Sequence, residues 1–263
     1  MLEVKNISVE TKKQVKLLED ISFCLSKGKA LGLTGESGAG KTTLIKSVMG
    51  ILDRTCQLNK GRIVVDGLDL KDLSSGKRRE MCGTTLGFIP QNPMTAFDKR
   101  MKIGKQIEET FCVRLKLSRE KALLLAEKKL ADVNLTDKRR VLHSYPAQLS
   151  GGMLQRVTMA ILLGLAPKYI LADEPTSALD EENRRLLLKQ LKLLKEETGI
   201  LMISHDVFAL QSLCQEVMVM ERGQITETGT MEKLLNAPQR QWTKEFSAAN
   251  SQQDRRQWIW KEL

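Results

Sequence analysis

Apolar residues along the chain follow two spacings, one typical of strands and one typical of helices. Residues 2–9 alternate partly between apolar and polar, and Ile21, Phe23 and Leu25 share one face of 18–25, as strand residues do. Residues 30–34 are short and apolar, which favours a buried strand. Further strands are predicted at 62–67, 86–91, 169–173, 199–204, 217–220 and 224–226. The early strand pairs predict an antiparallel layer beside a parallel sheet.

Helical spacing dominates the middle of the chain. Segments 103–117 and 119–133 are rich in Leu and Lys at helical periodicity. Shorter helices are predicted at 43–49, 153–160 and 181–198, whereas 50–61 reads as a polar connection. We therefore expect an α/β fold with a mixed β core, an antiparallel β layer and an inserted α-helical subdomain. The expected division of a single domain, 1–263, is a core of 1–94 and 165–235, a helical subdomain of 95–164 and a C-terminal tail of 236–263.

Composition narrows the class of protein without identifying it. The net charge is +10, which is compatible with nucleic acid, an anionic membrane face or simply a basic surface, and the basic residues are spread along the chain. The longest apolar run, near 159–166, is too short to span a membrane, and no leader opens the chain. We expect a soluble, intracellular protein. Five cysteines without a CxxC spacing, and two histidines, argue against a disulfide framework or a Cys/His metal site.

A glycine-rich loop joins the predicted strand at 30–34 to the predicted helix at 43–49. It reads Gly-Glu-Ser-Gly-Ala-Gly-Lys-Thr and fits the spacing G-x-x-x-x-G-K-[ST] of a phosphate-binding loop. Glycines let backbone N–H groups turn toward an anion, and the following helix adds its positive end. Lys41 can reach the β- and γ-phosphates of a nucleotide, and the Thr42 hydroxyl can hold Mg²⁺. The plainer alternative is a flexible glycine turn. The candidate nucleotide-binding residues are Gly35, Glu36, Ser37, Gly38, Ala39, Gly40, Lys41, Thr42 and Thr43.

Polar side chains follow three of the predicted strands. Asp173 and Glu174 end one strand, Gln91 ends another, and His205 follows a third. Asp173 would belong to a Mg²⁺ shell, and Glu174 could orient and deprotonate an attacking water. Gln91 could reach a metal or a water near the phosphates, and His205 could contact the γ-phosphate, since ligands of open α/β sheets bind at the carboxyl ends of strands. The alternatives are a turn at Asp173 and Glu174, a loop cap at Gln91 and a structural role for His205.

A second possible anion site precedes the predicted helix at 153–160. Ser150, Gly151 and Gly152 stand directly before it, where backbone N–H groups meet a helix N-terminus. The alternative is a capped helix start, which serine often provides.

These motifs together resemble the ATP-binding subunit of ABC transporters, over nearly the whole chain. In the order of that family, 35–42 looks like the Walker A loop, Gln91 the Q-loop, 149–156 the signature, 169–174 Walker B, 177–180 the D-loop and His205 the switch histidine. The resemblance implies a P-loop NTPase fold, ATP and Mg²⁺ as cofactors, and ATP hydrolysis. It implies catalytic roles for Glu174, His205 and Gln91, nucleotide contacts from Ser150, Gly151, Gly152 and Asp180, and metal contacts from Thr42, Gln91 and Asp173.

The resemblance also implies partners. Two ATPase subunits would pair head to tail, with each ATP between the Walker A loop of one and the signature of the other. Two transmembrane permease subunits would hold the pair at the cytoplasmic face of the membrane, and an extracytoplasmic solute-binding protein would act indirectly. The resemblance implies no nucleic-acid partner.

Finer features resemble the branch that imports dipeptides, oligopeptides and nickel. They are the segment 91–97, Tyr145-Pro146 and the segment 236–238. The signature Gly-Met-Leu-Gln-Arg looks most similar to that of nickel-import ATPases. This implies import of nickel or a metal chelate, with a distinct paralogue as the second ATPase. The alternatives are a peptide importer and a non-transport ABC ATPase of a soluble complex.

Overall fold

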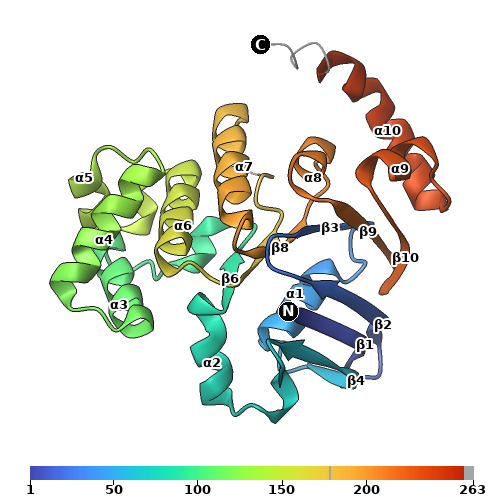
Figure 1. Ribbon diagram of the computed structural model, residues 1–263, viewed down its shortest axis with the longest axis horizontal. Helices are drawn as coiled ribbons and strands as arrows, with labels where there is room; N and C mark the ends of the chain where they lie inside the picture. The colour runs from blue at the N-terminus through green and yellow to red at the C-terminus, as the bar shows by residue number, and fades with distance from the viewer. Residues whose placement is uncertain (178, 258–263) are drawn as a thin grey trace. The chain divides into compact units, whose positions relative to one another are not determined.

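The computed structural model describes residues 1–177 and 179–257, with side chains described up to residue 250. The chain divides into two compact units, Leu73–Ile200 and the remainder, which joins Met1–Asp72 to the chain from Leu201 onward. Figure 1 shows the elements of each. The division at residues 94, 165 and 235 stays a prediction, and the last six residues of the predicted tail lie outside the described residues.

An antiparallel sheet opens the first unit, as the sequence predicts. It contains β1 (Leu2–Thr11), β2 (Lys16–Leu25), β4 (Cys56–Val65) and β5 (Leu68–Asp69) in the order β2-β1-β4-β5. The predicted face of β2 is buried, which confirms that its apolar residues point into the core. One expectation was wrong: 50–61 is not only a polar connection, because β4 begins at Cys56. That half of β4 is held by backbone pairing, with Cys56 opposite Thr11, and not by buried side chains.

The remaining strands of the first unit form a sheet of mixed direction. β3 (Ala30–Gly35) runs parallel to β9 (Glu216–Glu221), and β10 (Gln224–Gly229) runs antiparallel to β9. β8 (Gly199–Ile203) crosses the boundary between the units and ends in the first, where Ser204 N donates to Leu33 O at 3.1 Å. Every residue of β3 is buried, as expected of a strand inside a parallel sheet.

Helices of the first unit follow the strands. They are α1 (Lys41–Met49), α8 (Val207–Leu213), α9 (Met231–Asn236) and α10 (Gln241–Gln257). The sequence does not predict α8, because seven residues are too few to show a helical period; its start is fixed by Asp206, which accepts from Ala209 N at 3.1 Å. α10 lies beside α9 (Figure 1) and carries a stacked Trp242–Phe246 pair with ring centroids 4.9 Å apart.

The second unit combines a parallel strand pair with six helices. β6 (Leu86–Ile89) runs beside β7 (Tyr169–Asp173), with Ile89 opposite Ala172. The helices are α2 (Ser75–Thr84), α3 (Ile103–Leu115), α4 (Arg119–Asp132), α5 (Lys138–His143), α6 (Gly151–Leu165) and α7 (Glu181–Lys195). α3 and α6 approach closely at Gly164, where a Cβ would lie 2.4 Å from the Phe111 ring. The helices predicted at 103–117, 119–133, 153–160 and 181–198 are confirmed.

Candidate functional site

The glycine-rich loop wraps around its own lysine. Nζ of Lys41 donates hydrogen bonds to the carbonyl oxygens of Gly35 at 2.7 Å and Glu36 at 2.8 Å. The lysine is the first residue of α1 and is only 9% exposed. The ammonium group is therefore held at the mouth of the loop, beside the positive end of a helix, an arrangement that suits a phosphate group.

Two glycines of the loop are required by their surroundings. Gly35 has φ 141°, and a Cβ there would lie 2.0 Å from the carbonyl oxygen of Met220. Gly40 has φ 101°, and a Cβ there would lie 2.7 Å from Leu17 O. Since these close contacts are with backbone atoms, no side chain at either position could be accommodated by a rotamer change.

The loop is tied from outside to the hairpin between β9 and β10. The Glu36 carboxylate accepts a hydrogen bond from Arg222 N at 3.0 Å, and Ala39 O accepts one from Gly223 N at 3.0 Å. Sequence reasoning gave Glu36 only a nucleotide-binding role. The structure adds a role in positioning the loop.

His205 belongs to the first unit, as Lys41 does, and its pKa responds to the charge of that lysine. Partial burial, and then the positive charge of Lys41, lower the pKa of the imidazole below its ordinary value. The residue as a whole is nevertheless exposed. The structure therefore brings His205 close enough to Lys41 for the lysine charge to disfavour the imidazolium form.

In the second unit, three of the predicted metal and catalytic residues share one edge. β6 and β7 are parallel, so Gln91, Asp173 and Glu174 all follow the carboxyl ends of neighbouring strands. Asp173 is 7% exposed, and Glu174 has the left-handed backbone φ of 46°, which is uncommon for a residue with a side chain. Carboxylate and amide oxygens are ligands that Mg²⁺ accepts, so the donors at this edge fit this ion.

The predicted signature segment starts α6. Ser150 caps the helix by accepting from Met153 N at 3.2 Å, so the serine does the capping that the plainer interpretation expected. A Cβ at Gly151 would meet no other described atom within 4 Å, so there is free space beside this glycine. Gln155, 3% exposed, donates to Pro175 O at 3.3 Å and joins α6 to the segment that follows Glu174.

Asp180 is held by Asn183, a residue that sequence reasoning missed. The Asp180 carboxylate caps α7: Oδ1 accepts from Asn183 N at 2.9 Å, and the Asn183 amide donates to Oδ1 at 2.9 Å and Oδ2 at 2.8 Å. These hydrogen bonds, and then the charge of Arg156, lower the pKa of the Asp180 carboxyl. The only sequence signal for Asn183 is its position three residues after an N-cap aspartate.

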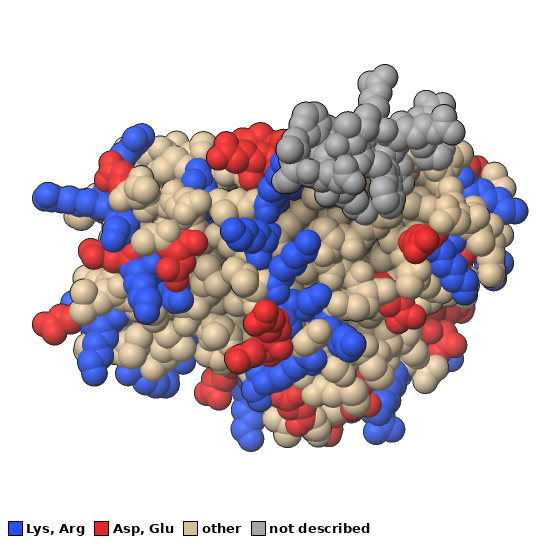
Figure 2. Space-filling view, turned by 45° about the horizontal axis from the view of Figure 1, so that its top comes forward, with Lys and Arg blue, Asp and Glu red and all other residues tan. Residues whose placement is uncertain are grey.

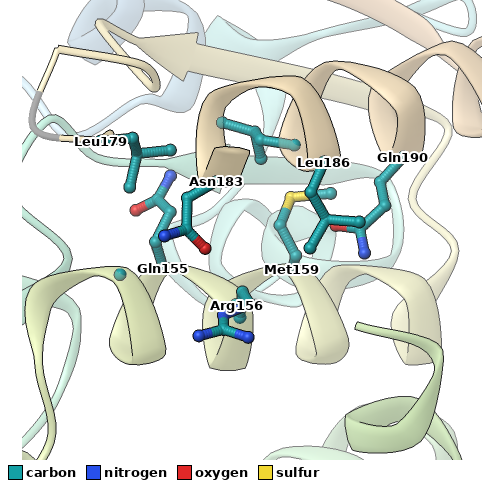
Figure 3. Close-up of a pocket in the computed structure, with 9 residues that line it drawn as sticks. Gln155, Arg156, Met159, Leu179, Asn183, Leu186 and Gln190 are labelled. Atoms are coloured by element: carbon teal, nitrogen blue, oxygen red, sulfur yellow. The ribbon is translucent and has the colours of Figure 1, made fainter. Parts of the chain in front are cut away.

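A small hollow between α6 and α7 adjoins this pair. Figure 3 shows Asn183 reaching from α7 toward α6, over Arg156. Arg156 donates to Asn134 O, just after α4, at 3.3 Å. Gln190 donates to Asp132 O, at the end of α4, at 3.4 Å. Polar side chains therefore join α4, α6 and α7 beside the signature segment.

The surface and the helices bear on the remaining expectations. Figure 2 shows Lys and Arg interspersed with Asp and Glu on the face it draws, which is the spread of charge that the sequence indicates. In the described part of the chain, no helix is long and apolar enough to cross a membrane.

Comparison with known proteins places these features in context. Residues 18–177 match the family model described as "ABC transporter". The chain is 36% identical over 247 residues to the metal-staphylopine import system ATP-binding protein CntD of Staphylococcus aureus (strain Mu50 / ATCC 700699), covering 93% of this chain and 91% of that protein. It is 34% identical over 249 residues to the oligopeptide transport ATP-binding protein OppD of Bacillus subtilis (strain 168), covering 92% and 70%.

A solved structure supports the fold alone. The dimeric structure of a post-hydrolysis state of the ATP-binding cassette MJ0796, bound to ADP and Pi, superposes with a TM-score of 0.77 at 23% identity. The superposition covers 88% of this chain and 99% of that one. The expected class, a P-loop ATPase with a mixed sheet and helices, is confirmed.

Proposed function

This chain belongs to the ABC transporter family as an ATP-binding and ATP-hydrolysing subunit of an importer, and we propose that the imported solute is a metal ion or a metal chelate. The observation that carries this proposal is the 36% identity to the ATP-binding protein of a metal-staphylopine import system, since that match covers 93% of this chain and 91% of the relative. The signature sequence at 151–156, which is similar to that of nickel-import ATPases, supports the same solute class.

Import of oligopeptides is the second candidate. The chain is 34% identical to an oligopeptide transport ATP-binding protein over 92% of its length. In either case the solute would be recognised by other subunits, so the choice between them rests on transport measurements.

We assign the phosphates of ATP to the loop in the first unit. Its N–H groups and Lys41 would bind them, and His205 would contact the γ-phosphate. The support is the inward hydrogen bonding of Lys41 to Gly35 O and Glu36 O and the lowered pKa of His205. The other loop residues, from Glu36 to Thr43, would contribute backbone contacts.

We assign the proton transfer of hydrolysis to Glu174, at the end of a strand of the second unit. Glu174 would accept the proton of the attacking water, and Thr42, Gln91 and Asp173 would hold Mg²⁺. When bound, this ion would neutralise charge that develops on the phosphates. Catalysis would then consist mainly of positioning the attacking water and stabilising charge.

We further propose the assembly in which the chain works. A second ATPase subunit, a distinct paralogue, would pair with it so that Ser150, Gly151, Gly152 and Asp180 face the nucleotide of the partner subunit. Two permease subunits would hold the pair peripherally at the cytoplasmic face of the membrane, and a solute-binding protein would deliver the solute. The support for a role in binding an anion from outside the chain is that Ser150, Gly151 and Gly152 stand at the N-terminus of α6, with free space beside Gly151.

The test is uptake in cells that carry the chain or its Lys41→Ala variant. Labelled nickel, a labelled nickel–staphylopine chelate and a labelled dipeptide are offered separately. Loss of nickel or chelate uptake in the variant, with dipeptide uptake intact, is the expected result. Loss of dipeptide uptake alone would replace the metal proposal by the peptide one, and intact uptake of all three would contradict both.

A further inference from the structure

Asn183 connects two segments that the proposed function places at the nucleotide of the partner ATPase. Its backbone N–H and its amide Nδ2 together make three hydrogen bonds to the Asp180 carboxylate, between 2.8 and 2.9 Å. An N-cap aspartate needs only the first of these to start a helix. The two amide contacts do more, because they engage both carboxylate oxygens and so fix the orientation of the group.

The same amide lies against the start of the signature helix. A Cβ built on Gly152 would be 3.5 Å from Asn183 Nδ2 and 3.7 Å from its Cγ, which is van der Waals contact. Figure 3 shows the side chain directed from α7 toward α6. The neighbouring Gly151 has open space at the corresponding position.

We propose that Asn183 is a positioning residue for ATP hydrolysis, which fixes the orientation of the Asp180 carboxylate beside the Ser150–Gly152 turn through a single amide. The proposal rests on the proposed function, since both segments matter for turnover only if they face a nucleotide. Hydrogen bonds from Asn183, and then the charge of Arg156, lower the pKa of the Asp180 carboxyl, which favours the carboxylate form that accepts the amide protons.

The test is the ATPase activity of the assembled importer with Asn183→Leu, which keeps the size of the side chain and removes both amide donors. We expect kcat to fall at least about fivefold, the equivalent of one hydrogen bond of about 1 kcal/mol. KM for ATP should change less than about twofold, because the loop of the first unit still binds the phosphates. Asn183→Ala should give the same loss, which separates the missing donors from a clash by leucine.

The matched control is Gln190→Leu. Gln190 lies on the same helix and donates one amide bond, to Asp132 O, but is not bonded to Asp180. Its kcat should equal that of the wild type. A double variant, Asn183→Leu with Asp180→Ala, should be no slower than Asp180→Ala alone, since Asn183 acts through that carboxylate.

The outcomes separate the two claims. A wild-type importer without ATPase activity would contradict the proposed function itself. A wild-type importer that is active, with Glu174→Gln inactive and both Asn183 variants at wild-type kcat, would overturn the positioning role alone. A double variant much slower than Asp180→Ala would also overturn it, because Asn183 would then act by another route.

Discussion

Lys41 Nζ lies 2.7 Å from the carbonyl oxygen of Gly35. Gly35 begins the glycine-rich loop, and Lys41 lies at its other end. The contact places a positive charge inside the loop. Replacing Lys41 by Ala removes the charge and a charge-assisted contact to the phosphates, so we expect ATP affinity to fall by about 10- to 100-fold. Equilibrium binding of a fluorescent ATP analogue measures this.

The control for that variant is Lys46→Ala. Lys46 lies on the same helix, and its Nζ contacts Asp53 Oδ2 at 2.9 Å on the surface. Its loss should leave the affinity unchanged. Equal affinities of the Lys41 variant and the wild type would contradict the assignment of the phosphates to this loop.

The titration of His205 reports on Lys41. Because burial and the lysine charge lower its pKa, the ring should be half-protonated below the ordinary value of about 6.5. In Lys41→Met the repulsion disappears, so the pKa should rise while remaining below the ordinary value. NMR of the ring carbons measures both values, and His143→Gln assigns the signals, since the chain has two histidines. A pKa that stays constant in the lysine variant would show that the two side chains do not interact.

Glu174→Gln separates binding from turnover. The amide cannot accept the proton of the attacking water, so we expect kcat to fall by at least about 100-fold, within the range of general base catalysis. ATP should still bind, because the loop is intact. Glu197→Gln, an exposed change in the same unit, should keep full activity. Retained turnover in the Glu174 variant would remove this residue as the base.

Two glycines of the loop should differ in their response to alanine. Gly38 has φ 81° and no described atom within 4 Å of a Cβ, so Gly38→Ala should cost only backbone strain, about 1–2 kcal/mol. Gly35→Ala places a methyl 2.0 Å from Met220 O and should destabilise the protein considerably more. Urea unfolding of both variants measures the difference. Equal midpoints would contradict the close contact at Gly35.

Much of the fold could be predicted because β3, β7 and β8 are buried throughout and mostly apolar, and motifs stand at their ends. The β3 strand and the loop after it are local features, readable from the consecutive residues 30–42. The start of β4 could not be predicted, because Cys56 is a strand residue only through its partner Thr11. The helix α2 was missed since it buries none of its own residues and so carries no apolar period.

The candidate site shows the same limit. Residue identity and spacing pointed to Lys41, Asp173 and His205, whose individual roles stay predictions. Asn183 belongs to no motif. The turn of α6 beside which it lies is about thirty residues away in sequence. Contacts of that kind arise from helix packing, which no local pattern records.

The hydrogen bonds from Arg222 N to Glu36 and from Gly223 N to Ala39 O have a consequence for the rate of nucleotide capture. A loop held in this way gives up its conformational freedom when the chain folds, and an arriving phosphate finds its N–H groups already oriented. Association should then be limited by diffusion and charge and not by a slow rearrangement of the loop. The hairpin at 222–223, far along the chain from Lys41, would thereby help to set the rate of nucleotide binding at the proposed phosphate site.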